Sequence, residues 1–229
     1  TTTPFDRESL TATIGWPAAT AITGDPSPLD QELAAISPRF ALLMYGTNDL
    51  GWFGYEWRNA DWFAENMLDI LDRLIEEGTI PIMSTIPPRD DSTTADAWVP
   101  RFNAIVRGLA QSLQVPLIDY HEELSALPDH GLAADGVHPN VHFSGISRPC
   151  HFTVDALDSG YNIRNLLSIE ALHRVRETLV LGEPALDEAG DPPSPGDGSP
   201  ETPHLIERLP YTALHNTLLS SHREIDVYD

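Results

Sequence analysis

Short apolar runs alternate along the chain with longer segments in which apolar residues recur every three or four positions. A short apolar run between proline, glycine or polar residues is typical of a strand buried on both faces, as in a parallel sheet. Such runs predict strands over residues 40–45, 80–86 and 115–119. The helical spacing predicts amphipathic helices over residues 29–36, 60–77, 95–113 and 160–181. This alternation predicts an α/β fold in which helices flank a parallel sheet.

The segments outside these elements have a composition that predicts loops and linkers. Residues 1–38 are irregular apart from the helical spacing over 29–36, and residues 141–158 form an irregular insert. Proline, glycine and acidic residues dominate residues 182–203, which predicts a linker. Residues 204–229 end in an alternating pattern, which indicates a tail that opens a further β-type domain. We therefore expect one domain over residues 1–181, followed by a linker and a short C-terminal tail.

The charge balance restricts the partners of this chain. Its formal net charge is −22, and its 13 basic residues are all arginines. A strongly acidic protein repels nucleic acids and anionic membranes, so neither is expected as a partner. Cys150 is the only cysteine, which leaves no internal disulfide and no cysteine-based zinc spacing. No apolar run approaches the roughly 18–20 residues of a membrane span.

A small polar loop, Gly46-Thr47-Asn48-Asp49, follows the first predicted strand. Open α/β sheets place their chemistry in loops at the carboxyl ends of parallel strands. Asn48 carries an uncharged amide that suits the stabilisation of a developing oxyanion. Upstream, Gly15 can present its backbone N–H where a side chain would obstruct a ligand. Asparagine and aspartate also favour ordinary turns, so a purely structural loop stays open as the alternative.

Aromatic residues gather directly after this loop, between residues 52 and 63. Trp52 and Phe53 stand nearest to the loop in sequence, and we expect them to line a pocket for an acyl or sugar group. The alternative is that the aromatic residues cap the sheet, as large apolar rings commonly do.

A second candidate site reads Asp135-Gly136-Val137-His138-Pro139. In a tight turn, a spacing of three residues brings the carboxylate of Asp135 to the imidazole of His138. The carboxylate then accepts the Nδ1–H of the ring and leaves Nε2 as a base. A zinc site would need further ligands at a helical spacing, so we expect no metal here.

The loop at residues 46–49 and the turn at residues 135–139 together resemble two sequence blocks of the SGNH (GDSL-type) hydrolases, a family of esterases and lipases. That family reads GxND in its third block and DxxHP in its fifth, and Gly15 falls where the glycine of its second block is expected. The resemblance covers roughly residues 5–180 and implies a flavodoxin-like, three-layer α/β/α fold. It also implies two roles: Asn48 and Gly15 donate to the oxyanion, and Asp135 and His138 belong to a catalytic triad.

The first block of the family, a strand followed by Gly-Asp-Ser, does not occur in this chain. That block carries the nucleophile and belongs upstream of Gly15. Ser9 has no strand or glycine before it, Ser27 follows Gly15, and Ser199 lies in the predicted linker. We therefore assign the nucleophile to no residue of this chain and expect it on an upstream segment or on another chain.

Three functions stay open at this point. The first is an ester hydrolase, of acyl esterase or deacetylase type, that acts on a small-molecule or polymer-borne ester. It would be complete only with the segment that carries the serine, so we expect this chain alone to be inactive. The second is a non-catalytic relative that binds carbohydrate or lipid, and the third is an inactive processed fragment. The mechanism that the resemblance implies needs no cofactor. A domain followed by a linker and a tail suits a secreted or periplasmic protein.

Overall fold

The computed structural model describes residues 7–181, which fall into two compact units that divide between Val115 and Pro116. The predicted linker over residues 182–203 and the tail over residues 204–229 lie outside the described residues. Within residues 7–181, no helix combines the length and the hydropathy that a membrane span requires.

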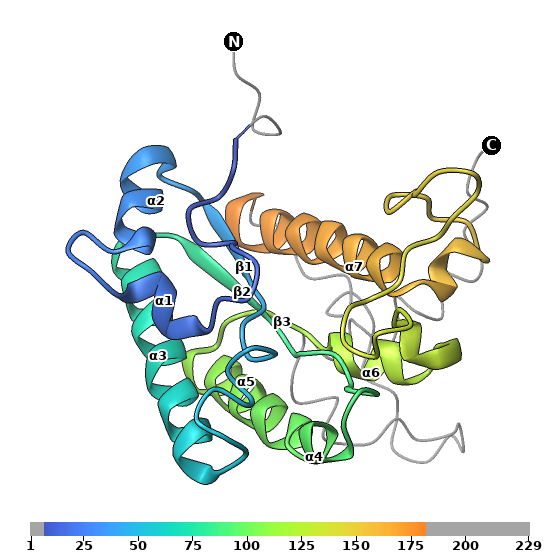
Figure 1. Ribbon diagram of the computed structural model, residues 1–229. Coiled ribbons are helices and arrows are strands. Elements are labelled where there is room, and N and C mark those ends of the chain that lie inside the picture. Colours follow the sequence, from blue (N-terminus) through green and yellow to red (C-terminus); the bar gives the residue numbers. More distant parts are fainter. Residues whose placement is uncertain (1–6, 182–229) are drawn as a thin grey trace, which may run out of the picture. The chain divides into compact units, whose positions relative to one another are not determined.

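The first unit is built on two parallel strands, β1 (Phe40–Leu43) and β2 (Ile80–Ser84). They run side by side in Figure 1, in register from Phe40 opposite Ile80 to Leu43 opposite Met83. Helix α3 (Trp57–Glu76) joins them, because parallel neighbours need a long crossover connection. The predicted α/β class, with helices flanking a parallel sheet, is confirmed.

Helix α3 buries one continuous apolar face. The five residues that the helical spacing assigns to this face are all buried: Phe63, Met67, Ile70, Leu71 and Leu74. The helix ends in a Schellman motif, in which the Thr79 N–H donates to the Leu74 carbonyl and Gly78 adopts a φ of +72°.

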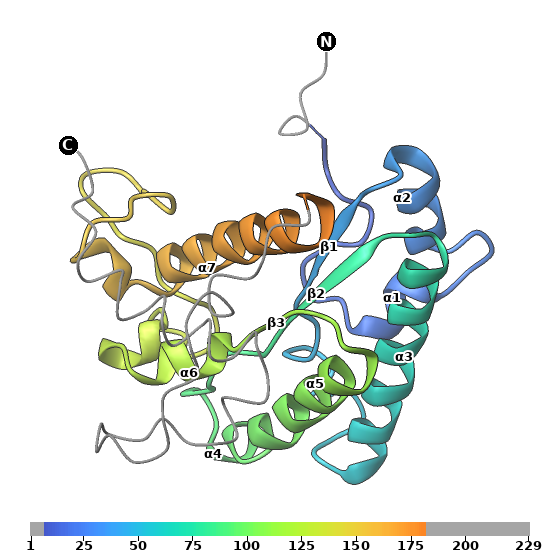
Figure 2. The ribbon, with the colours of Figure 1, turned by 180° about the vertical axis from the view of Figure 1, so that it is seen from behind.

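Helix α5 (Val99–Leu113) packs against both α3 and β2, as Figure 2 shows from behind. The rings of Phe63 and Phe102 stack between the two helices with centroids 4.8 Å apart. The sequence predicts a single helix over residues 95–113, but the structure has two, because α4 (Thr93–Asp96) ends before α5 begins. Pro100 lies in the first turn of α5, where a missing N–H is tolerated, whereas inside a continuous helix it would interrupt the hydrogen bonds.

The start of the first unit contains more helix than the sequence predicts. Helix α2 (Pro28–Ile36) is present as expected, and Ser27 and Asp30 form a capping box at its N-terminus. A further helix, α1 (Ala18–Ile22), precedes it, so the irregular structure predicted for that segment is wrong. Five residues make only about one and a half turns, which is too short for a helical period to be recognised.

Strand β1 is less buried than its continuous apolar run predicts. It ends at Leu43, and Leu42 is 47% exposed. Within residues 7–181, β1 pairs with β2 along one edge and with no other strand. Helices α3 and α5 pack against β2, whose central residues Ile82 and Met83 are fully buried. The expectation of a strand buried on both faces is therefore wrong for β1 and confirmed for β2.

The second unit is organised around helix α7 (Gly160–Val175), the first part of the helix predicted over residues 160–181. The chain then continues as a π-helical segment, η4 (Arg176–Leu181). Helix α7 packs against four shorter elements: β3 (Leu117–Ile118), α6 (Tyr120–Ser125) and the 3₁₀ turns η2 (Pro128–Gly131) and η3 (Ala156–Asp158). Cys150 lies exposed, as a free thiol, in the irregular segment before η3.

Candidate active site

Gly46 opens the loop that follows β1, and core packing fixes its position. It adopts a φ of +127°, a conformation that favours glycine. A Cβ at this residue would lie 2.9 Å from the side chain of Ile86 and 3.3 Å from the ring of Phe63, both of which are fully buried. The Leu50 N–H donates to the Gly46 carbonyl over 2.9 Å and closes the turn.

Asp49 is the buried polar residue of this loop, with an exposed fraction of 0%. Its Oδ2 accepts a hydrogen bond from the Gly46 N–H over 3.0 Å, and its Oδ1 accepts one from the Ala18 N–H over 2.9 Å. Burial raises the pKa of Asp49 to about 6, and the backbone donors oppose this shift. The sequence reasoning gives Asp49 no role, although its place beside Asn48 in the GxND motif is a signal that marks it.

Gly15 and Asn48, the predicted oxyanion donors, lie on two loops of the first unit that touch. The Asn48 Nδ2 donates to the Trp16 carbonyl over 3.2 Å. Gly15 has a φ of +79° in a turn that the Trp16 N–H closes on the Thr13 carbonyl, and a Cβ built on it would meet nothing within 4 Å. A side-chain amide has two N–H donors, so Asn48 keeps one for a ligand. The structure brings the two loops together, whereas the oxyanion role stays a prediction.

The aromatic residues after the loop divide between core and surface. Phe63 is fully buried, whereas Trp52 and Phe53 are 52% and 42% exposed. Trp62 stacks on Trp52 with centroids 6.3 Å apart and meets Phe53 edge-on at 4.9 Å. The guanidinium of Arg58 lies 4.8 Å from the centroid of the Phe53 ring. The two predicted pocket residues therefore form an exposed surface, and their contact with a substrate stays a prediction.

Asp135 and His138 form a closed hydrogen-bonded turn in the second unit. The Asp135 Oδ1 accepts from the N–H groups of Val137 and His138, each over 3.0 Å, and Oδ2 lies 2.7 Å from Nδ1 of His138. The His138 N–H contributes most to lowering the pKa of Asp135 to about 2, followed by the Val137 N–H and the imidazole. The side chains are 50% and 66% exposed. The contact that the spacing predicts is present, and it can hold the ring with Nε2 as the base.

The loop that carries this turn is anchored to the start of α7. The Asn140 Oδ1 accepts from the Gly160 N–H, and the Asn140 carbonyl accepts from the Tyr161 N–H, both over 2.8 Å. The Gly160 carbonyl accepts the hydroxyl of buried Tyr120 over 2.8 Å. A Cβ on Gly160 would collide with the carbonyl oxygen of Gly131, so glycine alone fits this crossing. Sequence reasoning misses these anchors because hydrogen bonds between remote segments leave no periodic signal.

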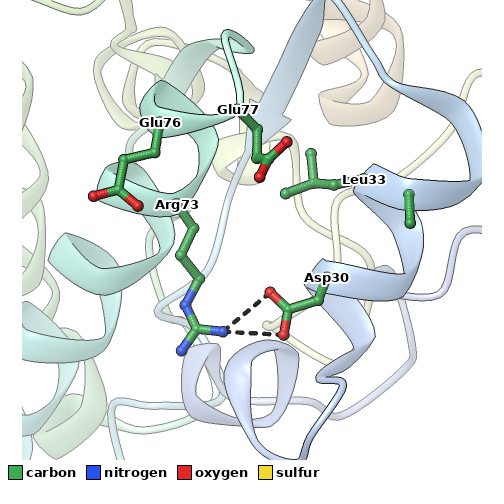
Figure 3. A pocket seen from close by; sticks show the side chains of 6 residues that line it. Asp30, Leu33, Arg73, Glu76 and Glu77 are labelled. Atoms are coloured by element: carbon green, nitrogen blue, oxygen red, sulfur yellow. Dashed lines mark hydrogen bonds and ion pairs between the residues drawn. The ribbon is translucent and has the colours of Figure 1, made fainter.

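A pocket of about 340 Å³ lies on the first unit, between α2 and the end of α3 (Figure 3). Its lining residues are Asp30, Leu33, Ala34, Arg73, Glu76 and Glu77. The Arg73 guanidinium pairs with Asp30 at 3.2 Å and with Asp69 at 2.8 Å, so its charge is already matched. The pocket contains none of the predicted site residues, and we assign it no part in the chemistry. Within residues 7–181, no cluster of three histidine, cysteine or acidic side chains is arranged to hold a metal.

Comparison with known families identifies the class of protein. The sequence model of the GDSL-like lipase/acylhydrolase family matches residues 7–143, a span that contains both motifs. The match covers more than half of the chain, so the chain belongs to this family of ester hydrolases. The resemblance to SGNH (GDSL-type) hydrolases that the two motifs indicate is confirmed.

Solved structures of GDSL-type hydrolases share the fold. A GDSL-like lipase from Bacteroides thetaiotaomicron has a TM-score of 0.53 and 17% identity, with 70% of this chain and 73% of that chain covered. A lipase/acylhydrolase from Enterococcus faecalis has a TM-score of 0.51 and 18% identity over 69% and 71% of the two chains. An acetylxylan esterase from Geobacillus stearothermophilus has a TM-score of 0.50 and 15% identity over 69% and 68%. No curated protein matches the chain.

Proposed function

We propose that the chain supplies the oxyanion donors and the His–Asp pair of a serine ester hydrolase, and that the serine comes from a segment outside this sequence. One observation carries the proposal: Asp135 Oδ2 lies 2.7 Å from His138 Nδ1, in a chain that belongs to a family of lipases and acylhydrolases. A carboxylate at Nδ1 selects the tautomer whose Nε2 can accept a proton.

In the proposed reaction, Nε2 of His138 takes the proton of the serine hydroxyl while the serine oxygen attacks the ester carbonyl. Asp135 orients the imidazole and stabilises its positive charge. The amide of Asn48 and the N–H of Gly15 donate to the tetrahedral oxyanion. Collapse of this intermediate expels the alcohol, which takes the proton from His138, and leaves an acyl-enzyme. A water molecule activated by the same imidazole then releases the acid.

The open edge of β1 supports a serine that arrives on an added strand. Within residues 7–181 this edge has no strand partner, and Leu42 beside it is 47% exposed. An unpaired edge presents N–H and C=O groups to a further strand. A strand added parallel to β1 would end at the same side of the sheet as β1, next to the loop that begins at Gly46.

The substrate we propose is an acyl ester on a small molecule or a carbohydrate polymer. The exposed rings of Trp52 and Phe53 offer flat apolar faces that suit a sugar ring or an acyl chain. One solved structure with the same fold is an acetylxylan esterase, which favours an O-acetylated carbohydrate among these substrates. A polymer-borne substrate agrees with the secreted or periplasmic location that we expect.

The test compares this chain with the longest product of its reading frame. Both are incubated with p-nitrophenyl acetate and with a fluorophosphonate probe, which labels activated serines. We expect a labelled serine upstream of Thr1 in the longer product and no label on this chain. A labelled serine within residues 7–181 would contradict an external nucleophile. A longer product that neither hydrolyses the ester nor takes up the probe would contradict the esterase.

A non-catalytic carbohydrate- or lipid-binding protein is the second candidate. The observation that favours it is the exposure of Trp52 and Phe53, with the guanidinium of Arg58 over the ring of Phe53. Binding of acetylated xylan or lipid vesicles by the longer product, without probe labelling, would support this candidate. An inactive processed fragment is the third, and an intact-mass measurement on the protein from its native source would identify the processing.

A further inference from the structure

Asp49 presents a buried carboxylate that pairs with no arginine or histidine in residues 7–181. Its oxygens accept instead from two backbone N–H groups, those of Ala18 and Gly46. An ionised carboxylate without a cation is unfavourable in a protein interior, even when it is hydrogen-bonded. Its presence therefore calls for an explanation other than the stability of the fold.

The two N–H donors belong to two different segments, a loop and the start of a helix. Gly46 opens the loop that contains Asn48, and Ala18 is the first residue of α1, directly after the loop that contains Gly15. The Asp49 carboxylate therefore bonds to the loop that contains Asn48 and to the helix residue that directly follows the loop that contains Gly15. The 3.2 Å hydrogen bond from the Asn48 side chain to the backbone of the other loop is a second link between them.

We propose that Asp49 is a positioning residue that holds the Gly15 loop and the Asn48 loop in one arrangement through its ionised carboxylate. That this arrangement serves to place the oxyanion donors rests on the proposed function. The coupling between the loops does not depend on catalysis.

The groups that face Asp49 do not titrate near neutral pH. Tyr45 donates its hydroxyl to the Thr11 carbonyl over 2.5 Å, and burial, followed by the charge of Asp49, raises the pKa of Tyr45 to about 12. Asn59, which α3 contributes, is uncharged and donates to the Asp49 carbonyl. Ala18, which α1 contributes, has no titratable side chain. Asp49 is therefore the group of this cluster that changes charge between about pH 5 and pH 8.

Protonation of Asp49 would weaken the link between the loops. It removes the negative charge of the carboxylate and places a hydrogen on one oxygen, so the hydrogen bonds that the backbone N–H groups donate to it become weaker. Because burial raises the pKa of Asp49 to about 6, this change falls just below neutral pH.

The test uses amide NMR spectra of the 229-residue chain from about pH 5 to pH 8, for the wild type, Asp49→Asn and Asp30→Asn. We expect the signals of Gly15 and Asn48 to move in the wild type with a shared midpoint of about 6. In Asp49→Asn this movement disappears, and hydrogen exchange at Ala18 and Gly46 accelerates about tenfold or more. The Tm near pH 7.5 does not fall, because the substitution also removes a buried charge.

Asp30→Asn is the matched control, because Asp30 also accepts a backbone N–H in the first unit but lies on the surface. It should leave the signals of Gly15 and Asn48 unchanged. Signals of Gly15 and Asn48 that do not follow Asp49 in the wild type would overturn the proposal, and this result does not need the variant to fold. A lower Tm in Asp49→Asn with both signals in place would overturn it as well. Neither outcome depends on esterase activity. These measurements therefore test the coupling between the loops, and the hydrolysis and probe assays test the proposed function.

Discussion

The two candidate motifs each contain one aspartate, and these two side chains lie in opposite environments. Asp49 is fully buried and has its pKa raised to about 6, whereas Asp135 is half-exposed and has its pKa lowered to about 2. Each carboxylate accepts two backbone N–H groups. Burial raises the pKa of Asp49, whereas the backbone donors, followed by the imidazole of His138, lower the pKa of half-exposed Asp135.

This difference suits two different tasks. Asp135 stays ionised throughout the neutral range and lies against an imidazole, which suits the stabilisation of a charge that appears during a reaction. Asp49 contacts no other side chain that changes charge near neutral pH and bonds to the backbone of its own loop and of helix α1, which suits positioning. Residue type alone therefore does not reveal the task of an aspartate in a motif of this kind.

The sharpest test of the comparison is the titration of the two carboxyl groups, followed by carbon NMR. We expect midpoints of about 6 for Asp49 and about 2 for Asp135. Because the pKa of Asp49 is raised on folding, its ionisation should lower the free energy of unfolding as the pH rises from about 4 to about 6. The stabilisation from Asp135 has the opposite sign and is lost as the pH falls from about 4 toward about 2. Equal midpoints for the two groups would break the comparison.

Replacement of the imidazole beside Asp135 should have the next largest effect. In the form of the protein that hydrolyses p-nitrophenyl acetate, His138→Ala should lower kcat about 10⁶-fold, because the base of a triad is lost. His173→Ala is the matched control, since His173 is also exposed and its Nδ1 lies 3.8 Å from the carboxylate of Glu177. A similar loss of kcat in both variants would exclude a specific role for His138.

Removal of the amide beside Asp49 tests the other motif. Asn48→Ala should lower kcat about 10²–10³-fold, the usual effect of losing one oxyanion donor, with a smaller change in KM. Asn66→Ala is a suitable control, because the Asn66 amide also donates to a backbone carbonyl of the first unit. A loss below about threefold in Asn48→Ala would remove Asn48 from the oxyanion role.

A substitution at Gly160, which anchors the Asp135–His138 loop to α7, should change the stability of the protein. Gly160→Ala introduces a Cβ against the Gly131 carbonyl oxygen and should lower the free energy of unfolding by about 1–3 kcal/mol, measured by urea denaturation. Gly108→Ala, in helix α5 with open space around its Cβ, should instead raise stability by about 0.5–1 kcal/mol. Equal stability of the two variants would mean that the crossing tolerates a side chain.

The elements that the sequence predicts well are those with a repeated local pattern. The buried face of α3 follows directly from its helical spacing, and β2 follows from its apolar run. The prediction fails where the decisive contact is remote or the segment is short. Helix α1 has five residues, and the exposure of Leu42 depends on which strands and helices lie beside β1.

In the candidate site, too, local contacts can be predicted from the sequence and remote contacts cannot. The contact between Asp135 and His138 is predictable because the two residues are three apart in one turn. The bonds of Asp49 to Ala18 and of Asn140 to Gly160 span about 31 and 20 positions, so no local pattern marks them. Comparison of motifs identifies the candidate catalytic residues in such a chain. The hydrogen bonds that hold these residues in place are identified from the structure.

The exposed thiol of Cys150 has a practical consequence for this protein. It is the only cysteine of the chain, so a maleimide dye attaches at one position without prior mutagenesis. The position belongs to the second unit and lies close to Asn165 of α7. Fluorescence from that dye would therefore report on the surroundings of α7 and leave the first unit free of label.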